Sequence, residues 1–538
     1  MQDKRYIQVI LPLRLGWEPC YCLDGTDTSF QVRIGDRVKV LFAHKPYIGV
    51  VSAVDVHPDI APDRIAAVQE LLPHLPAVSA KEIEFWRFLA DYYLCTIGEV
   101  YKASAAGKPQ SQVKRPRLKL PEFITAPDVD PELSALAAVL SKDKPVLYRG
   151  GDRAEEYLSV ATGCLAGGRG VLLLVPDKGS AKALVERFSG YFGEATVEYW
   201  SDVTPARRRL AADRVRSGEP YVLLGTRSSL LLPFESLGLI IVDEEQSPFY
   251  KNDSSPRYNA RDAAVMLGHI HSAPVVLGSS CPSLESEQNV ASGRYSSFGS
   301  AASRLLELID TASEKRKNGM LGCISRKLAE ECRKGRIAFI RGFEKQEEVA
   351  EAISNVFPGE EERFSVFSVP EASRSDLSEF DTVALLSADS LLRADDFRSD
   401  ERAFQLLESL NSSCRRLIIQ TRSPEHQAFH LEEHGGASAL LAERKAFSLP
   451  PFTRLVDILV PGAEKTRLLS ESLSRRLARA GFKASDSLPR TDGKNLVRIA
   501  LERDSRLQDR KRALREAVHA FCAERRFSGN VILDVDPA

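Results

Sequence analysis

The chain has 538 residues, of which 43% are hydrophobic and 27% charged, and its formal net charge is −1. These values are typical of a globular protein of about three to four domains. They exclude a strongly basic nucleic-acid-binding protein, so any contact with nucleic acid must come from local basic patches. The apolar runs are too short to cross a bilayer and the amino terminus lacks a signal-peptide pattern, which predicts a cytoplasmic protein without membrane contact.

The first 104 residues read as a β-rich module. Short alternating or apolar runs between residues 6 and 56 are separated by glycine, aspartate and proline, which predicts strands. Residues 80–94 repeat apolar side chains every three or four positions and predict an amphipathic helix. The stretch that follows is rich in proline, lysine and arginine without any period. We interpret residues 105–130 as a basic linker.

Two parallel α/β units follow, which we place at 131–300 and 301–430. Their strands are short apolar runs with helical segments between them, and this pattern is typical of a parallel sheet covered on both faces. The segment 284–335 between the two sets of strands is polar and predicts helix. After Pro450–Pro451 the pattern becomes α+β, and we assign 431–538 to a carboxyl-terminal domain. The predicted fold class is therefore α/β, with two tandem RecA-like lobes, a β-rich module before them and an α+β domain after them.

Carboxylates leave the apolar strand LGLIIV at Asp243 and Glu244, where a motor ATPase of this architecture holds Mg²⁺. The surrounding stretch, VLLGTRSSLLLPFESLGLIIVDEEQSPFYKNDSSPRYNARDAAV (222–265), resembles the PriA family of primosomal replication-restart helicases, which belong to superfamily 2. Other stretches match that family in the same order along almost the whole chain: LGSSCPSLES (277–286), LLSADSLLRADDFRSDERAFQLL (385–407), RKAFSLPPFTRL (444–455) and LDVDP (533–537).

The resemblance implies ATP and Mg²⁺ as cofactors, but the phosphate-binding loop is missing. Such a loop needs glycine amides, a lysine, and a serine or threonine hydroxyl. At the corresponding place the chain reads VLYRGGDRAEEYLSV (146–160), and no Gly-Lys-Ser/Thr occurs in the sequence. This shorter loop also carries three carboxylates that would repel a polyphosphate: Asp152, Glu155 and Glu156.

The second lobe departs from the family as well. The resemblance implies arginines that reach the γ-phosphate, yet only ESLNSSCRR (408–416) stands at that place. We interpret Arg415 and Arg416 as the polar lead-in to the next strand. A zinc-binding insertion is implied after FIRGF (339–343), but the sequence runs straight into a helix at 344–356, and the nine cysteines show no zinc spacing. We therefore expect no ATP, magnesium or zinc cofactor.

The residues that remain are suited to DNA. After Glu244 the chain combines aromatic rings, which stack on unpaired bases, with cations, which neutralise phosphates: Phe249, Tyr250, Lys251, Arg257, Tyr258 and Arg261. Arg227, in the GTRSSL turn, resembles a family loop that touches the strand backbone. The alternative is structural: the aromatics pack the loop against the first lobe, Arg261 pairs with Asp262 and Arg227 caps the sheet.

The amino-terminal module raises a further question. The resemblance implies that it binds the 3′ end of a leading strand in a small pocket. The chain departs from the family pattern there, because it reads WEPCYC at 17–22 and Leu41–Phe42–Ala43 where the family has Pro-Phe-Gly. Whether 3′-end recognition survives is left open by the sequence.

The leading hypothesis is a replication-restart protein that binds forked or single-stranded DNA with a non-functional ATPase site. The resemblance implies primosome proteins and the replicative helicase loader as partners, and roles in DNA repair and recombination. Asp243 and Glu244 would then be remnants of the Mg²⁺ and water positions. Two alternatives stay open: an active ATP-dependent 3′–5′ helicase, and a decayed paralogue with a protein-interaction role.

Overall fold

A computed structural model describes ten stretches of the chain: residues 5–23, 31–59, 61–105, 134–179, 181–200, 202–300, 306–392, 397–430, 436–527 and 531–537. All but the first residue of the predicted linker, 105–130, lies outside these stretches. Within them, no helix combines the length and the apolar character that a membrane span requires.

The amino-terminal module is an antiparallel sheet with strand order β2-β1-β4-β3-β5. Its strands are β1 (Tyr6–Ile10), β2 (Cys20–Cys22), β3 (Arg37–Phe42), β4 (Lys45–Val54) and β5 (Glu70–Leu71). Alternate side chains such as Val38 and Val40 point into a small apolar core. The helices α1 (Ala80–Tyr92) and α2 (Ile97–Ala103) follow, each opened by a capping box.

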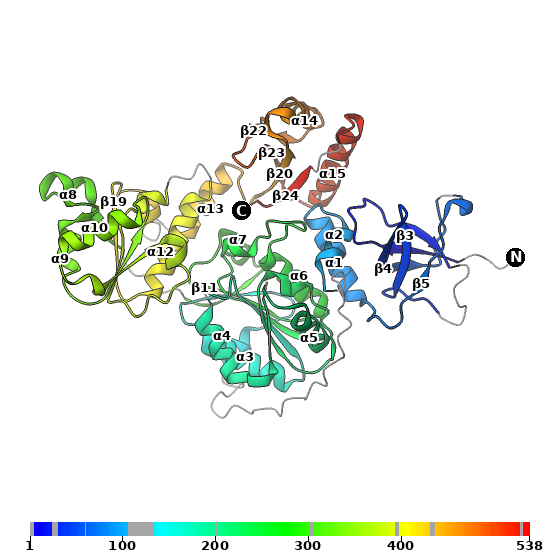
Figure 1. Cartoon of the computed structure of the whole chain (residues 1–538), viewed down its shortest axis with the longest axis horizontal. Helices are drawn as coiled ribbons and strands as arrows, with labels where there is room; N and C mark the ends of the chain where they lie inside the picture. The colour runs from blue at the N-terminus through cyan, green and yellow to red at the C-terminus, as the bar shows by residue number, and fades with distance from the viewer. Residues whose placement is uncertain are drawn as a thin grey trace.

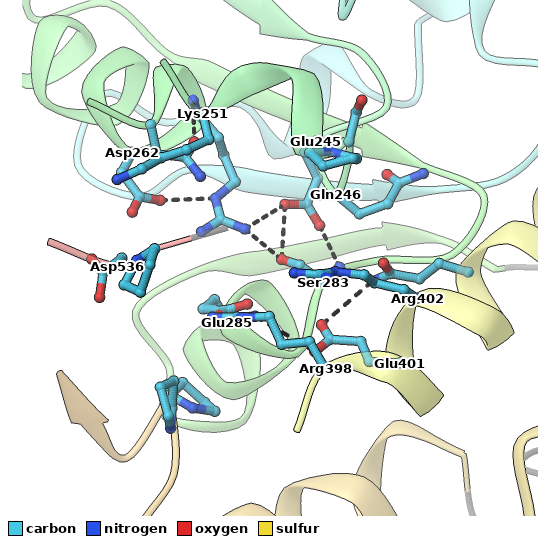
Figure 2. A pocket seen from close by; sticks show the side chains of 18 of the residues that line it. Glu245, Gln246, Lys251, Asp262, Ser283, Glu285, Arg398, Glu401, Arg402 and Asp536 are labelled. Atoms are coloured by element: carbon cyan, nitrogen blue, oxygen red, sulfur yellow. Dashed lines mark hydrogen bonds and ion pairs between the residues drawn. The ribbon is translucent and has the colours of Figure 1, made fainter. Parts of the chain in front are cut away.

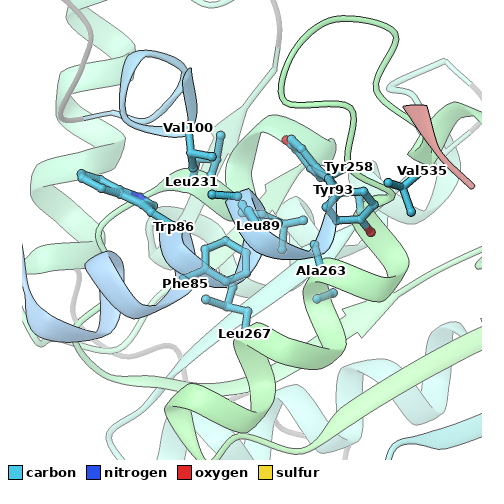
Figure 3. Close-up of a cluster of buried hydrophobic side chains, with 14 of the residues drawn as sticks. Phe85, Trp86, Leu89, Tyr93, Val100, Leu231, Tyr258, Ala263, Leu267 and Val535 are labelled. Carbon is cyan, nitrogen blue, oxygen red and sulfur yellow. The ribbon is translucent and has the colours of Figure 1, made fainter. Parts of the chain in front are cut away.

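Helix α1 fastens this module to the first lobe. Phe85, Leu89 and the following Tyr93 pack against α6 (Ala260–His271), as Figure 3 shows, and Val535 of the carboxyl-terminal strand joins the same cluster. The Tyr93 hydroxyl also donates to the Asn259 carbonyl over 3.3 Å. Three parts of the chain therefore share one hydrophobic core (Figure 1).

The first lobe is a seven-stranded parallel sheet of order β12-β6-β11-β10-β7-β9-β8. The strands are β6 (Val146–Arg149), β7 (Gly170–Leu174), β8 (Thr196–Tyr199), β9 (Val222–Gly225), β10 (Leu237–Val242), β11 (Val275–Ser279) and β12 (Ser296–Gly299). The helices are α3 (Ala154–Ala166), α4 (Lys182–Phe192), α5 (Pro205–Arg216), α6 and α7 (Leu284–Ala291). Strands β7 and β10 are buried along their full length because helices cover both faces.

The second lobe is a five-stranded parallel sheet of order β13-β19-β18-β16-β17. Its strands are β13 (Glu307–Asp310), β16 (Ile337–Arg341), β17 (Phe364–Ser368), β18 (Thr382–Leu385) and β19 (Leu417–Thr421). The helices are α8 (Thr311–Lys317), α9 (Arg326–Glu331), α10 (Gln346–Val356), α11 (Val369–Ala372), α12 (Ser399–Ser413) and α13 (Ala437–Ala446), with a small hairpin of β14 (Met320–Leu321) and β15 (Ile324–Ser325).

The prediction of helix across 284–335 is only partly correct. Strands β12 and β13 lie in this segment and form one edge of each sheet. Both are four residues long and half polar, so they lack the apolar run by which the inner strands are found. Because β12 belongs to the first sheet and β13 to the second, the chain passes between the lobes near residue 300.

The carboxyl-terminal domain is an antiparallel sheet backed by two helices, α14 (Arg467–Arg479) and α15 (Leu507–Glu524). Its strands are β20 (Thr453–Pro461), β21 (Lys483–Ala484), β22 (Leu488–Pro489), β23 (Lys494–Glu502) and β24 (Ile532–Val535). The predicted fold class, two parallel α/β lobes between a β-rich module and an α+β domain, is thus confirmed. The individual domain boundaries given above stay predictions.

Candidate functional site

The candidate site lies at the carboxyl ends of the first lobe's strands, where doubly wound sheets bind their ligands. Asp243 and Glu244 follow β10 directly, and the Asp243 amide donates to the Leu174 carbonyl at the end of β7 over 2.9 Å. Glu244 has a φ of +50°, a left-handed conformation that is unfavourable for a glutamate. Asp243 and Glu244 therefore lie side by side at the carboxyl edge of the first lobe's sheet.

A cation from the neighbouring turn occupies the space in front of these carboxylates. Arg153, between β6 and α3, donates through Nε to Asp243 Oδ1 over 2.9 Å, and a terminal nitrogen of its guanidinium lies 2.8 Å from the same oxygen. The guanidinium also pairs with Glu244 and donates to the Gly150 carbonyl. Burial lowers the pKa of Arg153, but Asp243 and Glu244 outweigh burial and raise that pKa well above its usual range.

Two further residues fit around the guanidinium. The Tyr157 hydroxyl, on α3, donates to Asp243 Oδ1 over 3.0 Å, and burial raises the pKa of this tyrosine well above its usual range. Gly278 on β11 leaves the room that this requires. A Cβ at position 278 would lie 1.6 Å from the Tyr157 hydroxyl oxygen and 2.9 Å from Arg153 Nε.

These residues do not fit a nucleotide with its metal. Oδ1 of Asp243 and Oε1 of Glu244, oxygens that Mg²⁺ would approach, already accept from Arg153, and a guanidinium bound to these carboxylates is not free to bind a phosphate. The acids of the turn have partners of their own: Glu155 pairs with Arg187, and Glu156 accepts from Ser134 over 2.6 Å. Within the described residues no group of three or more metal-ligating side chains is found.

Arg415 and Arg416 of the second lobe do not reach the carboxyl edge of the first lobe's sheet. Arg416 pairs with Glu307 and Glu331, and Arg415 pairs with Asp381. Both arginines precede β19 and so lie at the amino ends of the strands, away from the carboxyl edge.

Most of the predicted DNA-contacting side chains are built into the fold. Tyr250 is fully buried, and its hydroxyl donates to the carbonyls of Asp243 (2.5 Å) and Leu174 (3.0 Å). Tyr258 is buried and donates to the Arg227 carbonyl over 2.8 Å. Lys251 is buried too, with its ammonium 2.6 Å from the Val535 carbonyl. In this arrangement none of the three presents a ring or a charge to a strand of DNA.

Arg257 and Arg261 also have partners within the chain. Arg257 lies 3.3 Å from Asp534 of the carboxyl-terminal domain. Arg261 is buried between Glu245 and Asp262, at 3.2 and 2.8 Å. Burial lowers the pKa of Arg261, but these carboxylates outweigh it and raise that pKa well above its usual range.

Phe249 and Arg227 remain at the surface. The Phe249 side chain is 40% exposed, and the Cζ of Arg374, from the second lobe, lies 5.1 Å from the centre of its ring. Arg227 donates to the Phe249 carbonyl over 2.8 Å. The structure thus brings two cations and one open ring together across both lobes. An open ring flanked by cations is the arrangement on which a base can stack.

A buried ionic network joins the lobes beside this loop (Figure 2). The Ser283 amide and hydroxyl donate to Glu245, and the neighbouring Leu284 amide donates to Glu401 of α12 over 3.1 Å. Arg398 lies 2.7 Å from Glu285 across the same boundary. Burial raises the pKa of Glu285, but Arg398 and Arg261 outweigh it and hold that pKa well below its usual range. The network fixes how the lobes face each other around a hollow of about 110 Å³.

In the amino-terminal module the predicted departures from the family are partly exposed: Trp17 and Leu41 lie at the surface, whereas Tyr21 and Cys22 are buried. The Trp17 side chain is 59% exposed, and its ring centre lies 6.2 Å from that of Phe42. Ala43 and His44 form the turn between β3 and β4, both with positive φ. Glu18 pairs with Arg87 of α1 over 2.7 Å.

Two residues of the site were not predicted. Arg153 stands among the acids of the turn at 150–156, and the absence of a phosphate-loop lysine was the available signal that another cation stands there. Arg374 follows α11 in a polar stretch with no signal of its own, since only the fold brings it to Phe249.

Comparison with known proteins gives a consistent result. Residues 8–105 match the model of a 3′ DNA-binding domain (3′BD) of PriA. The chain is 30% identical to the replication restart protein PriA of Rickettsia felis over 311 residues, which cover 55% of this chain and 47% of that protein. It is 26% identical to PriA of Bacillus subtilis over 439 residues, 61% of this chain and 54% of that one. The chain spans about half the length of these curated relatives.

Among solved structures, the Pyrococcus furiosus Hef helicase domain matches at 12% identity with a TM-score of 0.33, covering 54% of this chain and 95% of that chain.

Proposed function

We propose that this chain, a PriA-like protein of helicase superfamily 2, binds forked or single-stranded DNA in replication restart and does so without ATP-driven unwinding. The proposal has two halves. The first is that the chain holds DNA, and the second is that no nucleotide cycle accompanies binding.

The binding half is supported by the match of residues 8–105 to a 3′ DNA-binding domain. A second support is the exposed Phe249 ring, with Arg374 over the ring and Arg227 on the backbone carbonyl of the same residue, which offers an aromatic surface and two charges for DNA. We keep Tyr250, Lys251, Arg257, Tyr258 and Arg261 as residues that position this loop. Primosome proteins and the replicative helicase loader are part of the proposal as partners only because of the resemblance to the PriA family.

The second half depends on one observation, the placement of Arg153 on Asp243 and Glu244. A motor holds Mg²⁺ and aims a water with the two equivalent carboxylates, and removal of one part of that machinery costs several orders of magnitude in rate. Here the carboxylates hold an internal cation instead. The phosphate-loop lysine and the arginines of the second lobe are missing from the sequence as well.

Two measurements on one sample test the proposal. Fluorescence anisotropy with a labelled fork is expected to give a Kd below about 10⁻⁵ M at low salt, weakening as salt rises. Phosphate release with the same fork and ATP is expected to equal that of the protein-free mixture. Binding weaker than that limit would contradict the first half. Phosphate release that Glu244→Gln abolishes would contradict the second.

The stacking face has its own test. Phe249→Ala is expected to weaken fork binding by about 1–3 kcal/mol, the range found for one base stacked on one aromatic ring. Phe447→Ala is the matched control, because that ring is 69% exposed on another domain. Equal effects of the two substitutions would remove Phe249 from the interface.

A further inference from the structure

The structure assigns to Arg153 a positioning role. Its guanidinium neutralises Asp243 and Glu244 and thereby holds the loop of residues 246–259 in the conformation that exposes Phe249. The loop is then ordered without nucleotide or metal. This inference rests on the proposed function, because it concerns the loop that carries Phe249. It adds how that loop is kept in place.

The need for a counterion follows from the sequence of the edge. Asp243, Glu244 and Glu245 are consecutive acids, and Glu245 is already paired with Arg261 at 3.2 Å. Asp243 and Glu244 share Arg153, whose side chain is 5% exposed. Without that guanidinium the two carboxylates would face each other at the buried end of β10, where like charges repel strongly.

The Asp243 side of the pair is tied to the loop through the backbone. The carbonyl of Asp243 accepts the Tyr250 hydroxyl over 2.5 Å, and the same hydroxyl reaches the Leu174 carbonyl at 3.0 Å. A shift of Asp243 toward solvent would break this anchor. Phe249, the open ring, is the residue next to Tyr250 in the chain.

The Glu244 side is tied to the loop through side chains. Gln246 donates to Glu244 Oε2 over 2.6 Å and accepts from the Ser279 hydroxyl over 2.6 Å. The Ser247 amide donates to the Glu244 carbonyl over 2.9 Å. Glu244 keeps a φ of +50° under these contacts, a conformation that persists only where the surroundings enforce it. Arg153 binds the side chain of the same glutamate.

The residues packed around Arg153 hold its guanidinium in one place. Tyr157 shares Asp243 Oδ1 with the guanidinium. The absence of a Cβ at Gly278 leaves space for both side chains. The edge is therefore filled from within the chain.

The test uses the full chain with three substitutions. Arg153→Met removes the charge and keeps the length, whereas Arg153→Lys keeps a charge. Arg187→Met is the control, because Arg187 also pairs with an acid of α3 (Glu155) but lies at the surface, with its side chain 42% exposed. Amide hydrogen exchange of residues 246–259 without DNA, and fork affinity by anisotropy, are each measured in EDTA and in Mg²⁺.

We expect Arg153→Met to speed exchange in 246–259 about tenfold or more and to weaken fork binding by a similar factor. Arg153→Lys is expected to restore part of both, and Arg187→Met to change neither. Because Mg²⁺ competes for DNA phosphates, fork affinity is expected to fall in Mg²⁺, whereas exchange of residues 246–259 in the parent is expected to be equal in EDTA and in Mg²⁺. A role in folding alone would instead speed exchange throughout β7 and β10, so those strands are the internal reference.

Two results would overturn the inference: unchanged exchange in 246–259 after Arg153→Met, or faster exchange spread evenly over the lobe. If Arg153→Met does not fold, Tyr157→Phe loosens the same carboxylate while it keeps the ring, and the same criteria apply to it. A parent that fails to bind the fork contradicts the proposed function, while the exchange measurement still decides the role of Arg153.

Discussion

The carboxyl edges of the two lobes differ although both lobes are parallel sheets of the same kind. In the first lobe the edge is filled by four bonded side chains: Arg153 binds Asp243 and Glu244, and Tyr157 donates to Asp243. In the second lobe the corresponding edge opens into a hollow of about 1090 Å³ between α8, α10 and the ends of β18 and β19. Only four residues, 342–345, join β16 to α10 at its rim.

The difference shows two ways in which a ligand-binding edge changes. Where the ligand's place is taken by a cation of the chain, the acids keep their positions, and the loop attached to them keeps its shape. In the second lobe the connection is short and a hollow remains at the ends of the sheet, where Gln420 of β19 accepts from the Ser325 amide and donates to the Cys323 carbonyl. The first lobe's edge is therefore bonded to the loop that carries Phe249, and the second lobe brings Arg374 to that ring.

The largest expected effect concerns how the lobes are joined. Glu401 of the second lobe accepts from the Leu284 amide of the first lobe over 3.1 Å, and the buried Arg444 pairs with Glu401 at 3.0 Å and so holds that carboxylate at the boundary. Arg444→Met is expected to lower the free energy of unfolding by about 3–5 kcal/mol, because it breaks a buried ion pair and leaves Glu401 with the more distant Arg398, at 3.5 Å. Pulse proteolysis in urea measures this.

The control for that substitution is Arg467→Met. Arg467 pairs with Glu471 on the surface of α14, and its side chain is 62% exposed, so the expected cost is below about 1 kcal/mol. Similar costs for the two variants would mean that the buried pair of Arg444 and Glu401 stabilises the fold no more than a surface pair does.

The next prediction sharpens the contrast within the first lobe. Gly278→Ala places a methyl group 1.6 Å from the Tyr157 hydroxyl oxygen, so Tyr157 must move away from Asp243. We expect a loss of about 3 kcal/mol in the free energy of unfolding. Gly151→Ala, in the turn of the same edge, meets no atom within 4 Å, and we expect a change of less than about 0.5 kcal/mol. Comparable urea midpoints for the two variants would show that the edge is not tightly filled.

The amino-terminal edge of the first lobe gives a smaller effect with a pH signature. His271, at the end of α6, is buried, and burial together with Lys81 and Arg169 lowers its pKa from 6.5 to about 4. The unfolded chain takes up a proton at this residue in that interval and the folded chain does not, so stability is full above about pH 6.5 and falls as the pH drops toward 4.

From the difference in pKa between the folded and unfolded chain, the free energy of unfolding is expected to fall by about 2 kcal/mol between pH 8 and pH 5. His271→Gln should remove this part of the pH dependence and leave the rest, as read from urea midpoints at both pH values. If parent and variant lose stability in parallel, the imidazole is not the group responsible.

Several features of the fold follow from local pattern. Buried runs such as Leu237–Val242 correctly predicted the inner strands. The acids at 150–156 predict that a phosphate cradle is missing there, and this stays a prediction. Strands β12 and β13 were not predicted, because each is an edge strand of four residues, half of them polar, and shows no periodicity.

The site could be predicted only in part, for a physical reason. The sequence does not distinguish an aromatic residue that stacks on a base from one that packs a loop against the fold. Tyr250 is fixed by two carbonyls of the fold, whereas Phe249 beside it faces water. Likewise, Arg153 meets Asp243 across 90 positions of the chain, and no local pattern encodes so distant a partner.

The smallest expected effect returns to the open edge. Asp389, after β18, accepts from the Thr421 hydroxyl and the Arg422 amide, at distances between 3.0 and 3.2 Å. Asp389→Asn removes the charge from these bonds and should cost about 1 kcal/mol. The matched substitution in the filled edge, Asp243→Asn, should cost more, because it also leaves the buried Arg153 with one carboxylate in place of two. Measured by urea pulse proteolysis of the two variants, equal costs would erase the distinction between the edges. A cost at Asp243 at least about 1 kcal/mol greater would mean that the first lobe's edge is held together by its internal cation.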